Sequence, residues 1–166
     1  LTDALSRSDQ ALALRPGLLP IHGERARIFL RLGRKNEAIA AARKVGRDLT
    51  VEPRWWADAD AIYTLRETGL QREAADYTQR LLAQFPADDY RRSFALAALG
   101  RGDEALSALG TVPSIALSRL YWHPMWDPWR NDPRFHAALV KLGCAKEYQV
   151  ARETLARLRN EPTPRK

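Results

Sequence analysis

A short motif recurs along the chain and limits the folds that the chain can adopt. In the motif glutamate is followed by alanine, and its copies are Glu37-Ala38, Glu73-Ala74 and Glu104-Ala105; Asp3-Ala4, with aspartate instead, is a weaker one. The alanines of the three complete copies are 36 and 31 residues apart, and a glycine lies five positions before each. Glycine suits the left-handed position that ends a helix. Each copy therefore predicts a helix, a tight turn and a second helix, and the period is typical of stacked helical hairpins.

The spacing of apolar residues extends this prediction to the whole chain. Ala38, Ala42 and Val45 are separated by three and four positions, which places them on one buried helix face. Pro53 is expected near the start of a helix, where its missing N–H costs little, and Pro86 is expected to end one. We predict an all-α fold with helices over residues 3–14, 19–32, 35–49, 54–68, 71–84, 88–99, 103–109, 114–122, 133–142 and 145–159.

The repeat pattern resembles the tetratricopeptide repeat (TPR) family over residues 1–113. The matching positions are Gly33, Ala38 and Val45, then Gly69, Ala74, Leu81 and Pro86, with Ala4, Ala11 and Pro16 fitting the end of an earlier, truncated repeat. The resemblance implies a right-handed α-α superhelix, a solenoid of hairpins. The chain departs from the family at His22 and Asp58, where an aromatic residue is usual, and Pro113 closes the third repeat early.

The composition changes after Pro113. Asp132 as N-cap, Pro133 as first helical residue and Gly143 as terminator bracket one helix. This end of the chain resembles the C-terminal end of multi-domain bacterial regulators in which TPR repeats follow winged-helix, adenylate-cyclase-type or kinase domains. The positions that carry this likeness are Pro124, Asp127 to Trp129, Asp132 to Phe135, Leu139, Leu142 and Gly143. It implies the sensory or interaction end of a longer signalling or transcription regulator.

Three regions follow from these patterns. Residues 1–113 are expected to form the repeats, residues 114–159 a helical C-terminal cap, and residues 160–166 a disordered tail. Three tryptophans lie close together at the start of the second region, at Trp122, Trp126 and Trp129. They fit either an aromatic recognition patch or a cap that covers the open end of the array, and the cap is favoured because large aromatic residues are often core. The first residues resemble the middle of a helix, so we expect a fragment of a longer protein.

The charge balance admits three classes of partner. The formal net charge is +7 and the sequence pI about 10.0, which suits nucleic acid, anionic lipid or an acidic protein. Arginines on solvated helix faces explain the same numbers without any partner. The chain has no long apolar run, and its mean hydropathy is −0.44, so we expect no membrane insertion by this segment and a cytoplasmic location.

The family resemblance also predicts a binding groove, because first helices of TPR hairpins line the concave face. Its contact positions fall on Arg27, Arg31, Trp56, Tyr63, Arg66, Tyr90, Arg91 and Phe94. Such a basic and aromatic groove would suit a peptide or partner domain with acidic and apolar residues. Alternatively, Tyr63 and Phe94 are core and the arginines are solvated. The carboxylate clamp of chaperone-binding relatives needs Lys and Asn at set positions. Gly23 and Arg27 occupy two of those positions, so that specialisation is not expected.

No residue pattern indicates catalysis. His123, His136 and Cys144 have spacings that fit no standard zinc signature, and Asp58 and Asp60 would point from different faces of one helix. We therefore expect no enzyme activity, no metal and no cofactor, and a protein-interaction scaffold as the function. Nucleic-acid binding by the basic surface and homo-oligomerisation through residues 3–14 and the last helix are the alternatives.

Overall fold

The computed structural model describes residues 2–47, 55–110 and 112–160, and in these ranges the chain is helical without a strand. The prediction of an all-α fold is confirmed. The elements are α1 (Thr2–Leu14), α2 (Leu19–Arg31), α3 (Lys35–Gly46), α4 (Trp55–Glu67), α5 (Gln71–Leu82), α6 (Tyr90–Leu99), α7 (Gly102–Ser107), α8 (Ser114–Trp122), the 3₁₀ helix η1 (Pro124–Trp129), α9 (Pro133–Lys141) and α10 (Ala145–Asn160).

The predicted helices lie within a few residues of those observed. The helix predicted over 88–99 begins instead at Tyr90, because Asp89 is its N-cap and accepts a 2.8 Å hydrogen bond from the Arg91 N–H. The 3₁₀ helix η1 was not predicted. The last residues of the helix predicted over 35–49, the first of the one over 54–68, and the tail after residue 160 lie outside the described residues.

Four glycines end helices in the same way. Gly33, Gly69, Gly100 and Gly143 have φ values of +72°, +87°, +91° and +71°. In each case the N–H of the following residue bonds back to a carbonyl five positions earlier, as from Arg34 to Phe29 at 2.9 Å. The glycine N–H bonds to the carbonyl three positions earlier, which completes a Schellman motif. The prediction that a glycine in the left-handed conformation ends each of these helices is therefore confirmed.

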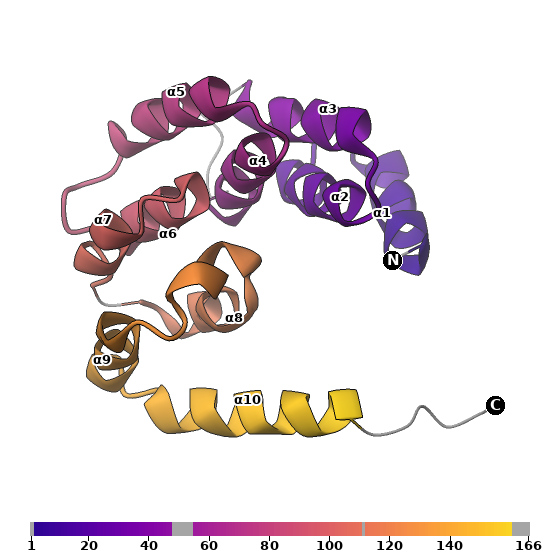
Figure 1. Ribbon diagram of the computed structural model, residues 1–166. Helices are drawn as coiled ribbons and strands as arrows, with labels where there is room; N and C mark the ends of the chain where they lie inside the picture. The colour runs from indigo at the N-terminus through magenta and orange to yellow at the C-terminus, as the bar shows by residue number, and fades with distance from the viewer. Residues whose placement is uncertain (1, 48–54, 111, 161–166) are drawn as a thin grey trace. The chain divides into compact units, whose positions relative to one another are not determined.

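The chain divides into two compact units, Leu1–Ala108 and Leu109–Lys166. In the first unit, α2 packs on α3 and α4, α4 packs on α5 and α6, and α6 packs on α7, while α1 packs on α2. Consecutive hairpins thus lie side by side through their first helices (Figure 1). Figure 1 shows α3 and α5 on one side of this unit, with α2, α4 and α6 on the other.

Small side chains allow the helices of the first unit to approach closely. Each hairpin buries the alanine of the repeated motif completely, since Ala38, Ala74 and Ala105 are 0% exposed. One such approach joins α2 to α4, where a Cβ built on Gly23 would lie 2.7 Å from the Ala57 Cα.

The second unit has an aromatic core. Trp126 and Phe135 are both fully buried, with ring centroids 5.7 Å apart. His123 begins η1 by accepting a 3.1 Å hydrogen bond from the Met125 N–H at its Nδ1. Of the three clustered tryptophans, Trp126 is core, Trp129 is half-buried and Trp122 is 42% exposed.

Arg130 holds the end of α8 against η1 within this unit. Its guanidinium donates hydrogen bonds to the backbone carbonyls of Tyr121 and His123, the latter at 3.0 Å. It also pairs with the Asp127 carboxylate at 2.7 Å. The carbonyls that end a helix lack intrahelical partners, so this side chain satisfies groups that the turn would otherwise leave to water.

Candidate interaction surface

The predicted groove residues come from three neighbouring helices of the first unit. Arg27 and Arg31 lie on α2, Trp56, Tyr63 and Arg66 on α4, and Tyr90, Arg91 and Phe94 on α6. Because α4 packs on both α2 and α6, these three sets are adjacent, and we call them the first-helix face. Their exposure differs: Arg31 is exposed, Phe94 is 0% exposed, and the others are half-buried. Phe94 is therefore a core residue and offers no surface to a partner.

Arg27 connects α2 to α4 through a buried carboxylate. Its Nε lies 3.3 Å from Oδ1 of Asp60, whose side chain is 0% exposed, and its Nη2 lies 3.6 Å from Glu24. The Nε contact is within ion-pair distance but lacks hydrogen-bond geometry. A buried carboxylate is costly without a nearby cation. Arg27 thus stabilises the α2–α4 packing, and 27% of its side chain remains exposed.

Arg66 connects α4 to α6. Its guanidinium lies 5.1 Å from the ring centroid of Tyr63, a cation–π contact. Its Nη2 donates to Glu67 at 2.6 Å, and its Nη1 donates to the Ala97 carbonyl of α6 at 3.4 Å. The side chain is 17% exposed, so most of its donors serve contacts within the unit.

Trp55 organises the aromatic part of the first-helix face. Its ring makes edge-to-face contacts with Trp56 at 5.5 Å, Tyr90 at 5.6 Å and Phe94 at 4.9 Å between centroids. Trp55 is 8% exposed, so a buried pair, Trp55 and Phe94, supports two half-exposed rings. Burial raises the pKa of the Tyr90 hydroxyl, which keeps it neutral. Of the two neighbouring tryptophans, Trp56, which the family resemblance placed in the groove, is half-buried, whereas Trp55, which it did not place there, is the buried one.

Arg91 is held at the start of α6. Its guanidinium donates to both oxygens of Asp89 at 2.6 to 3.0 Å and lies 4.2 Å from the Phe85 ring centroid. Burial opposes ionisation of Asp89, but hydrogen bonds from the Arg91 side chain and N–H outweigh it and lower the pKa of that carboxyl. This charge is consequently paired within its own helix end.

The arginines of the first-helix face are thus mostly paired. Arg27, Arg66 and Arg91 each lie beside a carboxylate. Arg31 is exposed and makes no ion pair with any residue in the described ranges. The face is accordingly an aromatic surface of mixed charge with one uncommitted cation, rather than a strongly basic groove.

The two aspartates of α4 have separate partners. Asp58 accepts a 2.5 Å hydrogen bond from the Tyr77 hydroxyl of α5, while Asp60 faces Arg27 of α2. Both are buried, and they point to different neighbours, as predicted from their spacing. They therefore do not form a shared acid pair of the kind that general acid–base catalysis uses.

The other candidate ligands are dispersed. His123 and Cys144 are buried in the second unit, and His136 is exposed. Among the described residues, no group of three or more His, Cys, Asp or Glu side chains could hold a metal ion. Over the same residues, no helix combines the length and apolar character that crossing a bilayer requires.

Comparisons with known proteins return no relative for this chain. No family model, no curated protein and no solved structure matches it.

Proposed function

We propose that the chain is a non-catalytic protein-interaction scaffold that binds an extended peptide or partner domain on the first-helix face. The proposal includes its place as the sensory or interaction end of a larger bacterial regulator. The observation that carries it is the row of half-exposed aromatic side chains on α4 and α6, supported by a buried pair. Large aromatic side chains that are already fixed lose little entropy on binding, which is why they dominate the energy of interaction surfaces.

The finer arrangement of the hairpins belongs to the same proposal. We propose that the first unit is a TPR-like solenoid with a right-handed superhelical twist, in which α2, α4 and α6 line the concave side. Three features support this view: the same Schellman turn ends α2, α4 and α6, α4 packs on both α2 and α6, and each second helix begins with the buried alanine motif.

The charges on the face select the chemistry of the ligand. Arg31 is an exposed guanidinium with no ion-pair partner among the described residues, and the guanidinium geometry favours bidentate pairing with a carboxylate. Trp56 and Tyr90 offer apolar ring surface on the neighbouring helices. The expected ligand is therefore an extended peptide that combines acidic and apolar or aromatic side chains.

Selection from a phage-displayed random peptide library on the whole chain tests this proposal. The enriched peptides are expected to be acidic and aromatic, and fluorescence anisotropy then gives the affinity of a synthetic copy. Trp56→Ala should weaken binding at least about tenfold, since aromatic hot spots carry 2 kcal/mol or more. Arg31→Glu should weaken it as well, while Arg7→Glu, an exposed position on α1 with the same charge change, should not.

Two results would contradict the scaffold proposal. One is a selected peptide whose affinity is the same for Trp56→Ala, Arg31→Glu and Arg7→Glu. The other is selective binding of a single-stranded oligonucleotide with affinity falling steeply as salt rises, which is the behaviour of a nucleic-acid site.

A further inference from the structure

A hollow lies between α3 and α5 of the first unit. It has a volume of about 220 Å³. Its floor is formed by Ala42, Gly46, Leu65 and Tyr77, and its rim by Arg43, Arg47, Glu73 and Arg80. This volume is below the range of roughly 300–1,000 Å³ that drug-sized ligands occupy. The hollow therefore fits a small chemical group rather than a whole ligand or a folded partner.

The rim carries a surplus of positive charge. Arg43 of α3 donates two hydrogen bonds, at 2.9 and 2.8 Å, to the two carboxylate oxygens of Glu73 on α5. The Arg43 hydrogen bond lowers the pKa of Glu73 and raises that of Arg43, so both remain ionised and neutralise each other. Arg47 and Arg80 are exposed and have no carboxylate partner within the described part of the chain. The rim thus has a net charge of about +2.

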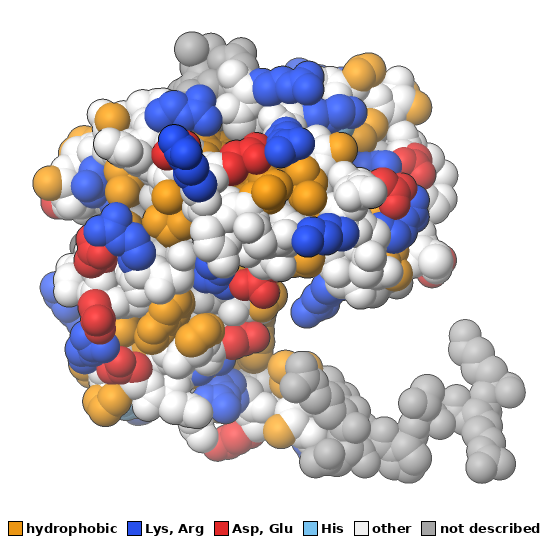
Figure 2. Space-filling view, turned by 45° about the horizontal axis from the view of Figure 1, so that its top comes forward, with side chains coloured by type: hydrophobic (Ala, Val, Ile, Leu, Met, Phe, Trp, Pro, Cys, Tyr) orange, Lys and Arg blue, Asp and Glu red, His pale blue; other side chains and the backbone are white. Residues whose placement is uncertain are grey.

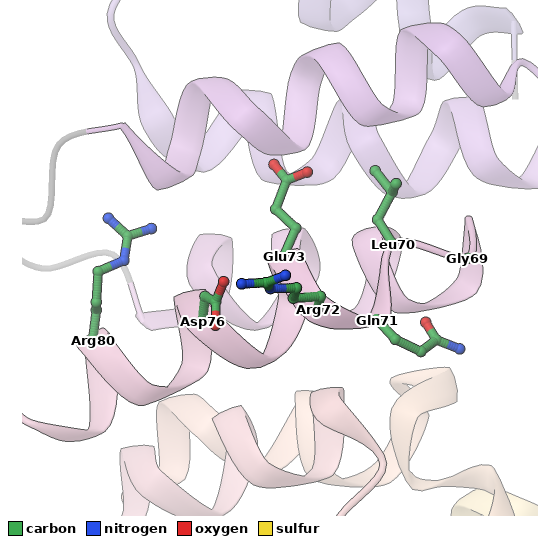
Figure 3. Close-up of a pocket in the computed structure, with 7 residues that line it drawn as sticks. All are labelled: Gly69, Leu70, Gln71, Arg72, Glu73, Asp76 and Arg80. Atoms are coloured by element: carbon green, nitrogen blue, oxygen red, sulfur yellow. The ribbon is translucent and has the colours of Figure 1, made fainter.

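The two uncommitted guanidiniums belong to opposite walls. Arg47 follows Arg43 by four positions at the end of α3, so the two project from the same side of the chain. Arg80 is on α5 with its guanidinium 5.7 Å from the Tyr77 ring centroid. Figure 3 shows Glu73 and Arg80 extending from the same side of α5. A group in the hollow would therefore meet cations from both helices.

The floor of the hollow is apolar and fixed. The Tyr77 hydroxyl donates to the buried Asp58 carboxylate at 2.5 Å, which holds the ring in place, and the side chain is 2% exposed. Glycine at position 46 keeps the space above this ring open, since a Cβ there would lie 3.0 Å from Tyr77 Cε1. Charges beside such a surface are less screened by water than those on an open helix.

A wider open hollow of about 680 Å³ adjoins this one and shares Glu73 and Arg80 with it. It also includes Arg72 and Asp76. Figure 2 shows Lys and Arg side chains gathered across the upper part of the view, with acidic side chains between them. The remainder of a ligand whose charged group lies between α3 and α5 has room there.

We propose that the hollow between α3 and α5 binds a phosphomonoester dianion, with Arg47 and Arg80 donating to its oxygens. The Arg43–Glu73 pair fixes the spacing of the two helices. Guanidinium groups match phosphate oxygens with two parallel hydrogen bonds, and a double negative charge matches the surplus on the rim. The C-terminal end of α3 carries a partial negative charge of about half a unit, which repels an anion. The two positive charges of Arg47 and Arg80 exceed this repulsion.

Isothermal titration of the whole chain at constant ionic strength tests the proposal. The probes are inorganic phosphate, glucose 6-phosphate and a phosphoserine peptide with its unphosphorylated form. Binding of all three phosphate-containing probes should reach saturation, and the unphosphorylated peptide should show no saturable binding. Tighter binding of the peptide identifies a phosphorylated side chain as the source, and tighter binding of the sugar phosphate identifies a small molecule; both results support the site. The second pKa of a phosphomonoester is about 6, so affinity should rise between pH 5 and pH 7, whereas sulfate should bind independently of pH.

Charge-removing variants locate the site. Arg47→Gln and Arg80→Gln should each weaken phosphate binding about tenfold, the value of one hydrogen bond between charged groups. Arg7→Gln and Arg31→Gln remove the same charge elsewhere and should leave affinity unchanged. Arg47 and Arg80 are both exposed, so the melting temperatures of all four variants should agree closely. Three results would each overturn the proposal. They are an equal loss of phosphate affinity in all four variants, competition by chloride as effective as that by phosphate, and the absence of saturable binding for every phosphate-containing probe. The phosphate proposal and the peptide proposal can fail separately, because Arg31 lies on the first-helix face whereas Arg47 and Arg80 line the hollow between α3 and α5.

Discussion

Replacing Gly23 by alanine probes a close contact between two helices of the first unit. Gly23 is buried in α2, and an added Cβ would lie 2.7 Å from the Cα, 3.0 Å from the Cβ and 3.1 Å from the carbonyl oxygen of Ala57 in α4. The first of these atoms is backbone, so no side-chain rotation relieves the contact. The substitution must therefore separate α2 from α4 at this point.

Two opposing terms set the magnitude for Gly23→Ala. Alanine is favoured over glycine inside a helix by about 0.5–1 kcal/mol. Overpacking of a close-packed contact costs about 1–3 kcal/mol, and a contact with backbone belongs in the upper part of that range. The expected net effect is a loss of about 1–2 kcal/mol in the free energy of unfolding. For a domain of about 100 residues this corresponds to a melting temperature lower by about 5–10 °C.

Urea denaturation followed by far-UV circular dichroism measures this effect. Gly17→Ala is the matched control, because a Cβ at Gly17 would have nothing within 4 Å, and its effect should stay within about 0.5 kcal/mol. Adding Ala57→Gly to the Gly23→Ala chain removes the 3.0 Å contact but leaves the 2.7 Å contact, so it should not restore the original stability. A Gly23→Ala chain as stable as the original, or more stable, would refute the reasoning.

Three further predictions concern single contacts. Tyr77→Phe should lower the free energy of unfolding by about 1–3 kcal/mol, since it removes the hydroxyl that donates to buried Asp58; an unchanged urea midpoint would contradict this. Arg130→Ala should destabilise the second unit by a similar amount because the carbonyls at the end of α8 lose their donors, measurable as earlier hydrogen exchange in α8, whereas exposed Arg134→Ala should have a smaller effect. Burial lowers the pKa of His22, and Lys44 and Arg25 add to the shift; the neutral ring is therefore favoured in the folded state, and the stability it contributes above about pH 6.5 should be lost as pH falls through the lower folded pKa. His22→Gln should reduce the difference in melting temperature between pH 7 and pH 5, and an undiminished difference would argue against this assignment.

The helices were predictable because their signals are local. Glycine at the turn, alanine five positions later and apolar residues at helical spacing each act within one hairpin, and the observed positive φ values at Gly33, Gly69 and Gly100 show that conformation. The exception is η1, which contains Pro124 and Pro128 and was not predicted. Its first turn is closed by a hydrogen bond from the Trp126 N–H to the His123 carbonyl at 3.1 Å.

The side-chain partners were not predictable because they depend on which helices are neighbours. The spacing of Asp58 and Asp60 placed them on different faces of one helix, but it could not assign Tyr77 to one and Arg27 to the other. The same limit applies to Phe94. Its position on α6 is compatible with a surface role, and its burial depends on residues that are its neighbours only in space, such as Trp55 of α4.

The location of uncommitted positive charge follows from this pairing. On the side of α2, α4 and α6, the buried Asp60 carboxylate and the Ala97 carbonyl already engage Arg27 and Arg66. Between α3 and α5, the one carboxylate on the rim is engaged by Arg43, which leaves Arg47 and Arg80 in excess. A partner attracted by charge alone would therefore be drawn more strongly to the hollow between α3 and α5 than to the predicted groove on α2, α4 and α6. The reciprocal variants separate the two: Trp56→Ala should affect peptide binding alone, and Arg47→Gln should affect phosphate binding alone.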